Sequence, residues 1–511
     1  MRRAVALSAV ACAVTVAVLC AIHRRTDSPT RAAVRVTRLK PRVMSGSSTC
    51  AAAFPLGDPC DTLDGGTVGA PGVGDAGPVC NITSAPYNAV PDASTAQTAA
   101  IQAAINACAD AGGTVIVPAG TYLSGTLTLG SNMVLSLGTA ATLAGVIPAD
   151  VDAAAIDYPS PVPFPTPNNS NSPPAERSFL YANGAKNLTI VGPGTIDGNG
   201  GAEIWSQEAG TPDYDRPIAV WITNSQDITI SDTQVLNSAL WTVVAMQDVG
   251  VLVEDVTIAS PNSKERDGLD VVDSHDVCVD NVTVSSEDDS ICMKSGSLMG
   301  VDSVHVVNST ADGNKIPSGF LSEGNGLKLG TTSYGRFDNI CFENINVSGY
   351  REAAMAVESV DGANIANVFF SNITLNQVES PFYVIFGDRY ELPEGGVKKT
   401  GSLSCVTFQN ITGSDVSMPW GSAITGTMTP DAGTLTIHNV TFSNVALDLL
   451  GGGQVSAVQP GEYDGSYPHP SNFGQLPGWA FWTRHADAVT FVAIDASVAP
   501  PDSRLPFNLQ P

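Results

Sequence analysis

The chain has 511 residues, of which 43% are apolar, and its 50 Asp and Glu against 24 Lys and Arg give a formal net charge of −26. That length and apolar content are ample for a large buried core. Because nucleic acids are polyanions, so acidic a chain excludes them as expected partners, and a polyanionic substrate would need a local basic pocket.

The first 49 residues differ from the rest. They hold nine basic residues and one acid, Asp27, which leaves a net charge of −34 from position 50 onward. The apolar run 4–22, "AVALSAVACAVTVAVLCAI", follows Arg2 and Arg3 and is typical of an export signal or a single membrane anchor. We therefore expect a leader and basic linker over 1–49, and a single domain over 50–511 that is secreted or held outside the cell by the anchor.

The ten cysteines fall into groups. Two lie in the leader, and in an exported protein one or two disulfides are expected among the next four, Cys50, Cys60, Cys80 and Cys108. The scattered later cysteines are expected to be small buried side chains: Cys278, Cys292, Cys341 and Cys405. Neither cysteines nor histidines show metal-ligand spacing, so we expect no metal and no cofactor.

Residues 94–113, "STAQTAAIQAAINACADAGG", predict a helix. Ser94 is the expected N-cap, and Gly112 and Gly113 are expected to end the helix. Its apolar residues recur with helical spacing, so one face should cover the end of the structure that follows.

A short strand motif recurs from residue 187. It alternates polar and aliphatic or Phe residues and often ends in Asn or Asp, as in "NLTIVG" (187), "DITISD" (227), "GVLVED" (250), "DVCVDN" (276), "SVHVVN" (303), "NICFEN" (339), "NVFFSN" (367), "CVTFQN" (405) and "NVTFSN" (439). Such strands cannot bury an apolar face alone, so they must stack. The pattern predicts an all-β fold, a right-handed parallel β-helix with the helix at 94–113 as a short N-terminal cap.

Spacing and composition separate this fold from its alternatives. Propeller blades repeat at longer intervals than the 23, 26 and 27 residues seen between 227 and 303, and a sandwich does not predict one motif in phase. The motif's asparagines are expected at turns or in ladders. Three long loops, 158–176, 310–324 and 386–402, could close one end of a cleft, and residues 460–511 are expected to form a last coil with its own cover.

Two adjacent aspartates, Asp288 and Asp289, stand in "SSEDDSICMKSG". Asp267 precedes Asp288 by 21 residues, close to one coil, and stacked coils lie about 4.8 Å apart. The three carboxyl groups should therefore share one face, where they cannot all stay ionised. A protonated acid beside an ionised one suits glycosidic-bond hydrolysis, because one group protonates the leaving oxygen while another activates water. Asp270 is expected to satisfy backbone groups at a turn.

The chain resembles glycoside hydrolase family 28, the polygalacturonases and rhamnogalacturonan hydrolases, over roughly residues 85–450. The resemblance is carried by "SALWTVV" (238–244), "ERDGLD" (265–270) in place of the family's Asn-Thr-Asp-Gly-Ile-Asp, and "EDDSICMKSG" (287–296) in place of Gly-Asp-Asp-Cys-Ile-Ala-Ile-Lys-Ser-Gly. It implies an inverting hydrolase of pectic polysaccharide that uses no metal. By it, Asp288 is the general acid, and Asp267 and Asp289 hold and activate the water.

Two family motifs are altered. Asn325 in "EGNGLKLG" stands where Gly-His-Gly has its histidine, and Ala356 and Glu358 in "AMAVES" replace the two cations of Arg-Ile-Lys. The resemblance implies that those cations bind a galacturonate carboxylate, so their loss favours a different glycan or an exo-acting variant. Lys294, Lys328 and Arg389 are the remaining candidate cations, and with Asn325 they form the expected substrate-binding set.

The spacing of several aromatic residues and of His305 predicts structural roles for them. We expect Trp241 in the core, together with the aromatics that could otherwise stack on sugars, Tyr383, Tyr390, Trp479 and Trp482. His305 is expected to be an ordinary side chain of the repeat.

Two other functions fit the sequence. A pectate-lyase-like enzyme would need calcium and a basic residue, for which Arg266 is the nearby candidate; a β-helix that only binds glycans is the other. In each case the expected partner is a polysaccharide and the expected state is a monomer.

Overall fold

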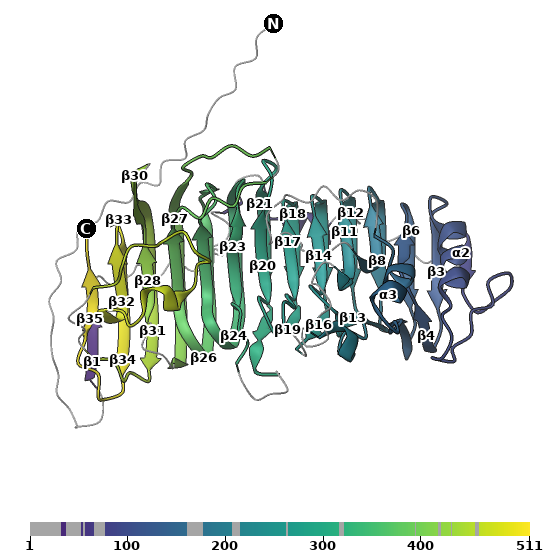
Figure 1. The fold of residues 1–511 in the computed structure, drawn as a ribbon, viewed down its shortest axis with the longest axis horizontal. Helices are drawn as coiled ribbons and strands as arrows, with labels where there is room; N and C mark the ends of the chain where they lie inside the picture. The colour runs from purple at the N-terminus through teal and green to yellow at the C-terminus, as the bar shows by residue number, and fades with distance from the viewer. Residues whose placement is uncertain are drawn as a thin grey trace, which may run out of the picture.

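A computed structural model describes residues 32–36, 53–54, 57–65, 77–160, 177–206, 215–261, 264–315, 321–393, 395–416, 421–430, 432–454 and 459–511. The chain winds into one long parallel β-helix, whose coils run along the solenoid from the N-terminal to the C-terminal side (Figure 1). Among these residues no helix has the length and apolarity needed to span a membrane. The leader predicted at 4–22 lies outside them.

Three faces are built from strands stacked in parallel register. The first face, which carries the site, contains β8 (Ser178–Asn183), β11 (Ile218–Thr223), β14 (Val243–Met246), β17 (Leu269–Val272), β20 (Ile291–Ser295) and β23 (Leu327–Ser333). The second contains β9 (Lys186–Val191), β12 (Gln226–Ser231), β15 (Val249–Glu254), β18 (His275–Asp280) and β21 (Val301–Val307). The third contains β7 (Ala141–Gly145), β10 (Thr195–Asp197), β13 (Gln234–Leu236), β16 (Thr257–Ser260), β19 (Thr283–Ser286) and β22 (Thr310–Asp312).

Later coils are made of longer strands that bend from one face to the next. They are β24 (Arg336–Ser359), β26 (Val368–Phe386), β27 (Ser402–Val416), β31 (Ile437–Leu449) and β34 (Thr490–Val498). On the first face the stack continues through β28 (Ser422–Thr425), β32 (Gly478–Arg484) and β35 (Leu505–Leu509). Strand β1 (Ala32–Val36) pairs antiparallel with β34 at the C-terminal end.

The recurrent motif stacks in phase, as the sequence predicts. Val277 pairs with Val251 and Val304, and the same register continues into β24 through Ile340. Inside the solenoid, apolar side chains of successive coils lie directly over one another. The rings of Phe342, Phe370, Phe408 and Phe442 stack with centroid separations of 4.8–4.9 Å.

The motif's asparagines turn the corners between faces. Asn344, Asn372, Asn410 and Asn444 all have φ between 55° and 57°, a left-handed conformation that Asn tolerates better than most residues. Each side-chain amide donates to the asparagine one coil earlier, for example from Asn410 to Asn372 at 2.9 Å. This ladder satisfies the amides, as the sequence analysis anticipated.

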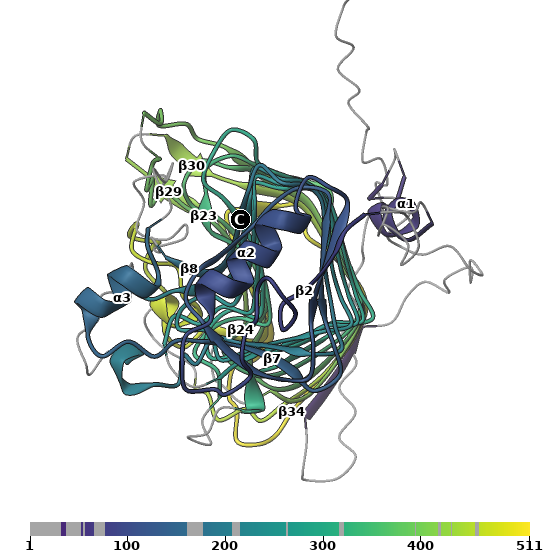
Figure 2. The same cartoon turned by 90° about the vertical axis from the view of Figure 1, so that its right-hand side faces the viewer.

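Helix α2 (Thr98–Cys108) crosses the open end of the solenoid (Figure 2). It covers the end with buried Ile101, Ile105 and Cys108, which confirms the predicted cap. Its start is not at Ser94, however. The backbone amide of Ser94 donates to the Asp92 carboxylate in a preceding turn, and Gln97 occupies the N-cap position without a side-chain cap. The helix also ends before Gly112, with Ala109 as the C-cap.

Disulfides tie early segments to the solenoid. Cys80 bonds to Cys108 within the N-terminal region, as predicted, whereas Cys60 bonds to Cys278 on β18, 218 residues away. Cys341 is also disulfide-bonded. The expectation that Cys278 and Cys341 are simple buried side chains is therefore wrong, because segments before the repeats pack on the outside of the second face.

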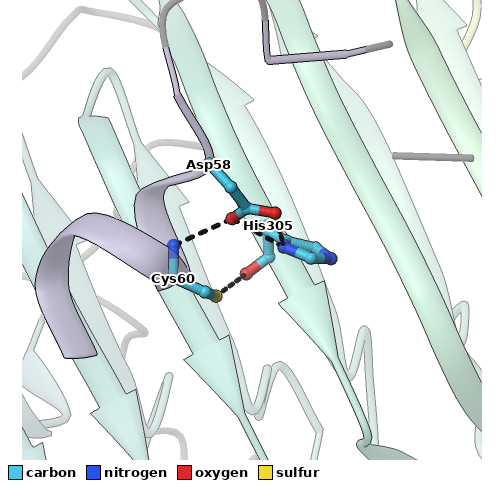
Figure 3. Close-up of side chains that lie close together, drawn as sticks. All are labelled: Asp58, Cys60 and His305. Atoms are coloured by element: carbon cyan, nitrogen blue, oxygen red, sulfur yellow. Dashed lines mark hydrogen bonds and ion pairs between the residues drawn. The ribbon is translucent and has the colours of Figure 1, made fainter. Parts of the chain in front are cut away.

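Helix α1 (Pro59–Gly65) lies outside the solenoid beside the second face (Figure 2). His305 on β21 approaches the Asp58 carboxylate at 2.9 Å, and Cys60 lies next to both (Figure 3). His305 is thus part of this attachment and not merely a repeat side chain. Because Cys60 is bonded to Cys278, its sulfur is not available as a thiolate ligand to a metal.

Candidate active site

The carboxylates gather where β17 and β20 begin on the first face. A small pocket there is lined by Trp241, Glu265, Asp267, Asp288, Asp289, Lys294, Lys328, Thr331 and Tyr467. Three of these are the predicted catalytic aspartates, and two are predicted substrate-binding lysines. Successive coils therefore bring Asp267 together with Asp288 and Asp289, as the geometry of a solenoid requires.

The register between the two coils differs by one residue from the predicted one. Leu269 pairs with Ile291, and the Gly268 amide donates to the Asp289 carbonyl at 2.8 Å. The coil is thus 22 residues long, which sets Asp267 beside Asp289 and leaves Asp288 one position earlier. The three still share one pocket.

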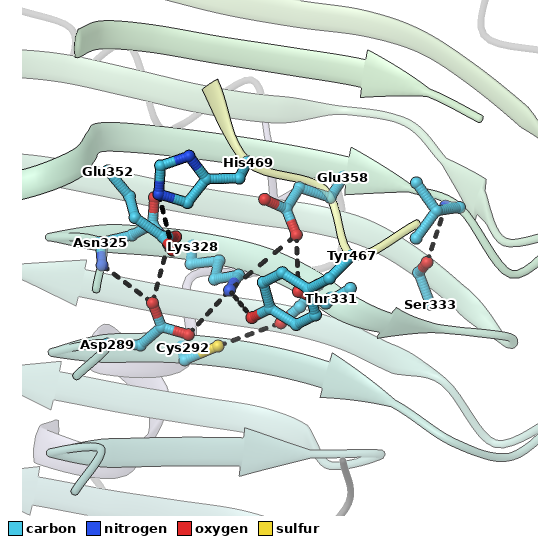
Figure 4. Close-up of polar contacts among 12 residues, drawn as sticks. Asp289, Cys292, Asn325, Lys328, Thr331, Ser333, Glu352, Glu358, Tyr467 and His469 are labelled. Atoms are coloured by element: carbon cyan, nitrogen blue, oxygen red, sulfur yellow. Dashed lines mark hydrogen bonds and ion pairs between the residues drawn. The ribbon is translucent and has the colours of Figure 1, made fainter. Parts of the chain in front are cut away.

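Asp289 is held as a carboxylate. Its Oδ1 accepts hydrogen bonds from the backbone amide of Asn325 at 2.9 Å and from Asn325 Nδ2 at 2.8 Å, while its Oδ2 lies 2.9 Å from Lys328 Nζ (Figure 4). Burial opposes ionisation, yet the nearby Lys328 and Lys294 and these donors hold the pKa of Asp289 below its ordinary value. Asp289 can therefore accept a proton from water.

Asp288 has the opposite environment. Burial, followed by the charge of Asp289, raises the pKa of Asp288 well above its ordinary value. Its Oδ1 accepts the backbone amide of Asp289 at 2.8 Å, and the side chain remains partly exposed in the pocket. Asp288 therefore keeps its proton to higher pH than an ordinary aspartate and is suited to donate it to a bound ligand.

Asp267 shares a buried ammonium with Asp270. Lys294 Nζ lies 2.6 Å from Asp267 Oδ2, donates also to Asp270 Oδ1, and stands 4.1 Å from the centre of the Trp241 ring. Burial raises the pKa of Asp267 well above its usual value, and Lys294 opposes that effect. Asp270 lies within β17 and accepts from Lys294, so the expected turn role is wrong. Trp241 is buried as predicted, but it also lines the pocket.

The predicted substrate-binding residues occupy three different places. Lys294 and Lys328 line the pocket, although both are already bonded to carboxylates. Asn325 is fully buried behind Asp289; it also donates to Glu352 at 2.6 Å and accepts the Ala353 amide at 3.0 Å. Arg389 pairs with Asp361, with Nε 2.9 Å from Oδ1, and is not among the described residues that line the pocket.

Two altered family positions lie beside Lys328. Ala356 is its neighbour on the next strand, and Glu358 Oε2 approaches Lys328 Nζ at 3.9 Å and accepts from Thr331 at 2.9 Å. Burial raises the pKa of Glu358 to about 7. This part of the site therefore carries Lys328 among several acids, with Arg389 donating to the nearby Thr331 carbonyl at 3.3 Å, whereas the family pattern has cations at positions 356 and 358 themselves.

Sequence reasoning missed the residues that arrive from outside the repeats. Tyr467 lines the pocket, with its Oη 3.1 Å from Lys328 Nζ, and His469 Nε2 lies 3.4 Å from Glu352 (Figure 4). Both come from the segment between β31 and β32. No motif marks them, since only the fold brings that segment back to the first face. Tyr383, Trp479 and Trp482 are buried core residues, as predicted. The same prediction is wrong for Tyr390, which is only half-buried and has Lys398 Nζ 4.1 Å from the centre of its ring.

The basic residue required by the lyase alternative is placed unfavourably. Arg266 is fully buried and donates to the carbonyl of Gly200. Burial, together with Arg216, lowers the pKa of Arg266 to about 9. Its side chain is not part of the described pocket lining, so it is poorly placed to take a proton from a bound sugar.

A parallel β-helix whose pocket sets an aspartate of raised pKa beside one of lowered pKa has the parts of a glycoside hydrolase. Comparison with known proteins agrees, because residues 108–457 match the model for glycosyl hydrolases family 28. The chain belongs to that family, and it is a glycoside hydrolase.

Individual relatives are distant. The endo-polygalacturonase of Pectobacterium carotovorum subsp. carotovorum is 26% identical over 337 residues, covering 63% of this chain and 78% of that protein. The exo-poly-alpha-D-galacturonosidase of Dickeya chrysanthemi is 28% identical over 272 residues, covering 44% and 43%. Among solved structures, the family 28 exopolygalacturonase of Yersinia enterocolitica aligns with a TM-score of 0.62 at 19% identity, covering 85% of this chain and 78% of that one, which supports the β-helix fold.

Proposed function

We propose that the protein hydrolyses glycosidic bonds in a pectic polysaccharide of the galacturonan or rhamnogalacturonan type, with inversion. The observation that carries the proposal is that Asp288 and Asp289 line one pocket with different partners: Asn325 and Lys328 donate to Asp289, whereas the one described donor to Asp288 is a backbone amide. The names of the relatives support the substrate class.

The chemistry follows from these roles. The Asp288 carboxyl gives its proton to the glycosidic oxygen as the bond from that oxygen to the anomeric carbon breaks. The Asp289 carboxylate takes a proton from water, whose oxygen forms the new bond to the anomeric carbon from the opposite face. Asp267, held by Lys294, lies beside Asp289 and would help to fix that water.

The proposal is tested by incubating the protein with homogalacturonan, rhamnogalacturonan and neutral glycans and measuring new reducing ends. Asp288→Asn should lower the rate on the cleaved polymer by about 100-fold or more, because a general acid is lost. Asp276→Asn changes an exposed acid on β18 of the second face, away from the pocket, and should leave the rate nearly unchanged. No reducing ends on any pectic polymer, or full activity of Asp288→Asn, would contradict the proposal. A calcium-dependent unsaturated product would indicate the lyase instead.

We also propose that the enzyme acts outside the cell. Its disulfides, Cys60–Cys278 and Cys80–Cys108, support this location, because such bonds persist in oxidising compartments. Fractionation of producing cells should find the protein in the medium or on the outer surface, and cytosolic protein with reduced cysteines would contradict it.

A further inference from the structure

The segment 459–477, here called the strap, leaves the solenoid between β31 and β32 and returns across the first face. Figure 4 shows its backbone passing over the strands that carry Lys328 and Glu358, with Tyr467 and His469 directed toward them. From sequence, this stretch is expected to cover the last coil. It lies instead beside the catalytic acids.

Buried anchors fix both ends of the strap. Tyr463, Phe473 and Leu476 are at most 6% exposed and pack in one cluster with Tyr383 and Trp482 of the first face. A Cβ on Gly387 would stand 2.5 Å from the Tyr463 ring, so the glycine makes room for that anchor.

Polar contacts hold the strap as well. Arg484 on β32 donates to the carbonyls of Pro460 and Gly461, at 2.9 and 2.7 Å. Within the strap, Asn472 Nδ2 donates to the Tyr467 carbonyl at 2.8 Å. The strap is therefore a built part of the site wall.

The tip of the strap contacts the site. Lys328 Nζ donates one hydrogen bond to Tyr467 Oη and another to Asp289 Oδ2. His469 approaches Glu352, which accepts from Asn325, the residue that donates to Asp289. Tyr467 and His469 thus mark where the open pocket ends.

The row of side chains beyond the acids is covered. On neighbouring strands, Lys328 pairs with Ala356, Ala356 with Tyr383, Tyr383 with Ala423, and Ala423 with Trp482. None of these is more than 1% exposed. Toward the N-terminal end of the solenoid, Asp270 pairs with Val244 and Val244 pairs with Trp221. Val244 and Trp221 are also fully buried. Among the described residues of this row, a polymer bound at Asp289 therefore finds no exposed side chains along which to continue.

We propose that the strap makes the site a pocket for the end of a polysaccharide chain, so that the enzyme releases short sugars from one chain end, with Tyr467 and His469 setting that limit. This inference rests on the proposed hydrolysis of pectic polymers. It assigns a specificity role to residues that lie outside the family's motifs.

The test compares loss of viscosity with release of reducing ends on homogalacturonan and rhamnogalacturonan. The wild-type protein should release mono- or disaccharides from the first turnovers while viscosity stays nearly constant. A Tyr467→Ala/His469→Ala variant keeps the buried anchors of the strap. With this variant, the viscosity of the polymer solution should fall several-fold more per bond broken than with the wild type, and the products should be longer. Asp464→Asn changes an exposed strap residue and should behave as the wild type.

The outcomes are distinct. Early loss of viscosity with the wild-type protein would overturn the chain-end pocket and leave the proposed hydrolysis intact. If the double variant kept the wild-type product pattern, the strap tip would not be what limits the site. Absence of reducing ends on every polymer would overturn the hydrolysis itself, and this inference with it.

Discussion

Asp288 and Asp289 are adjacent in the chain but differ in their hydrogen-bond donors. Asp289 accepts from Asn325 and Lys328, whereas Asp288 accepts one backbone amide. The pKa values of these two neighbouring carboxyl groups are therefore shifted in opposite directions, so that one can serve as acid and the other as base, as acid–base hydrolysis requires.

Lys328 is the residue that most directly keeps Asp289 ionised. Lys328→Gln should raise the pKa of Asp289, so the acidic limb of the kcat/KM profile should move upward by about one pH unit or more. Steady-state kinetics between pH 3 and 8 (roughly the range in which carboxyl groups titrate) would measure the shift. Lys264→Gln, at an exposed ion pair with Glu323, is the matched control. An unchanged acidic limb would show that Lys328 does not control the base.

Glu358 should make the protein less stable as the pH rises from acidic to neutral. Its pKa is about 7 when folded and about 4.5 in the unfolded chain, so between these values the native state retains a proton that the unfolded state has lost. Stability from this group therefore falls as pH rises from about 4.5 to 7, by about 3 kcal/mol at most. Glu358→Gln keeps an acceptor for Thr331 and removes that loss.

Thermal unfolding would test this expectation for Glu358. The Tm of Glu358→Gln should exceed that of the wild type by an amount that grows between pH 5 and pH 8. The two proteins should have similar Tm values near pH 5. A difference that is constant with pH would contradict the assignment of a raised pKa to Glu358.

That Asp267, Asp288 and Asp289 share one pocket could be predicted from sequence, because they lie at the starts of strands that repeat in phase. The 21-residue interval between Asp267 and Asp288 indicated a shared face, and only the paired register shows that the coil is one residue longer. The contacts of Asn325 with Asp289 and Glu352 depend on side-chain directions that spacing does not encode. For that reason a substrate contact was predicted where the structure has a residue that positions Asp289.

At the scale of elements, the asparagine ladder lets short strands turn corners without unsatisfied amides. Asn372 donates to Asn344 and accepts from Asn410, with φ at 55°. Asn372→Ala should lower the free energy of unfolding by about 2 kcal/mol. The change removes two hydrogen bonds and places an alanine in the left-handed backbone conformation, which alanine adopts less readily than asparagine.

The variant Asn372→Gly separates these causes. Glycine adopts the left-handed conformation readily, so it should lose the ladder and avoid much of the backbone strain. Denaturant unfolding should therefore rank Asn372→Gly above Asn372→Ala in stability. Equal stability of Asn372→Ala and the wild type would show that the ladder contributes little.

The strand motif and the capping helix were predictable because both show a strong periodicity. The start of α2 was not predictable in this way. Serine is a common N-cap residue, but the backbone amide of Ser94 donates to the Asp92 side chain in a turn before the helix. The strap was also missed in its true position. Its residues follow no repeat, and their place is fixed by contacts of Tyr463 and Phe473 with strands far away in the sequence.

At the scale of the whole molecule, the solenoid turns distance along the chain into side-by-side contact. Asp267, Asp289 and Asn325 come from three successive coils, and the strap adds Tyr467 from near the C-terminal end. Disulfide Cys60–Cys278 ties a segment before the solenoid to its second face in the same way. The fold class followed from the repeat, but these long-range attachments depend on surfaces that exist only once the coils have stacked.

The central claim is that this stacking keeps Asp288 protonated beside an ionised Asp289. The pH dependence of kcat/KM on the pectic polymer that the enzyme cleaves tests it most directly. We expect a bell-shaped profile whose alkaline limb, set by Asp288, lies well above the usual pKa of an aspartate, about 3.9, and whose acidic limb, set by Asp289, lies below it. An activity that declines as pH rises through about 4 would mean that Asp288 ionises like an exposed aspartate, and would contradict the account.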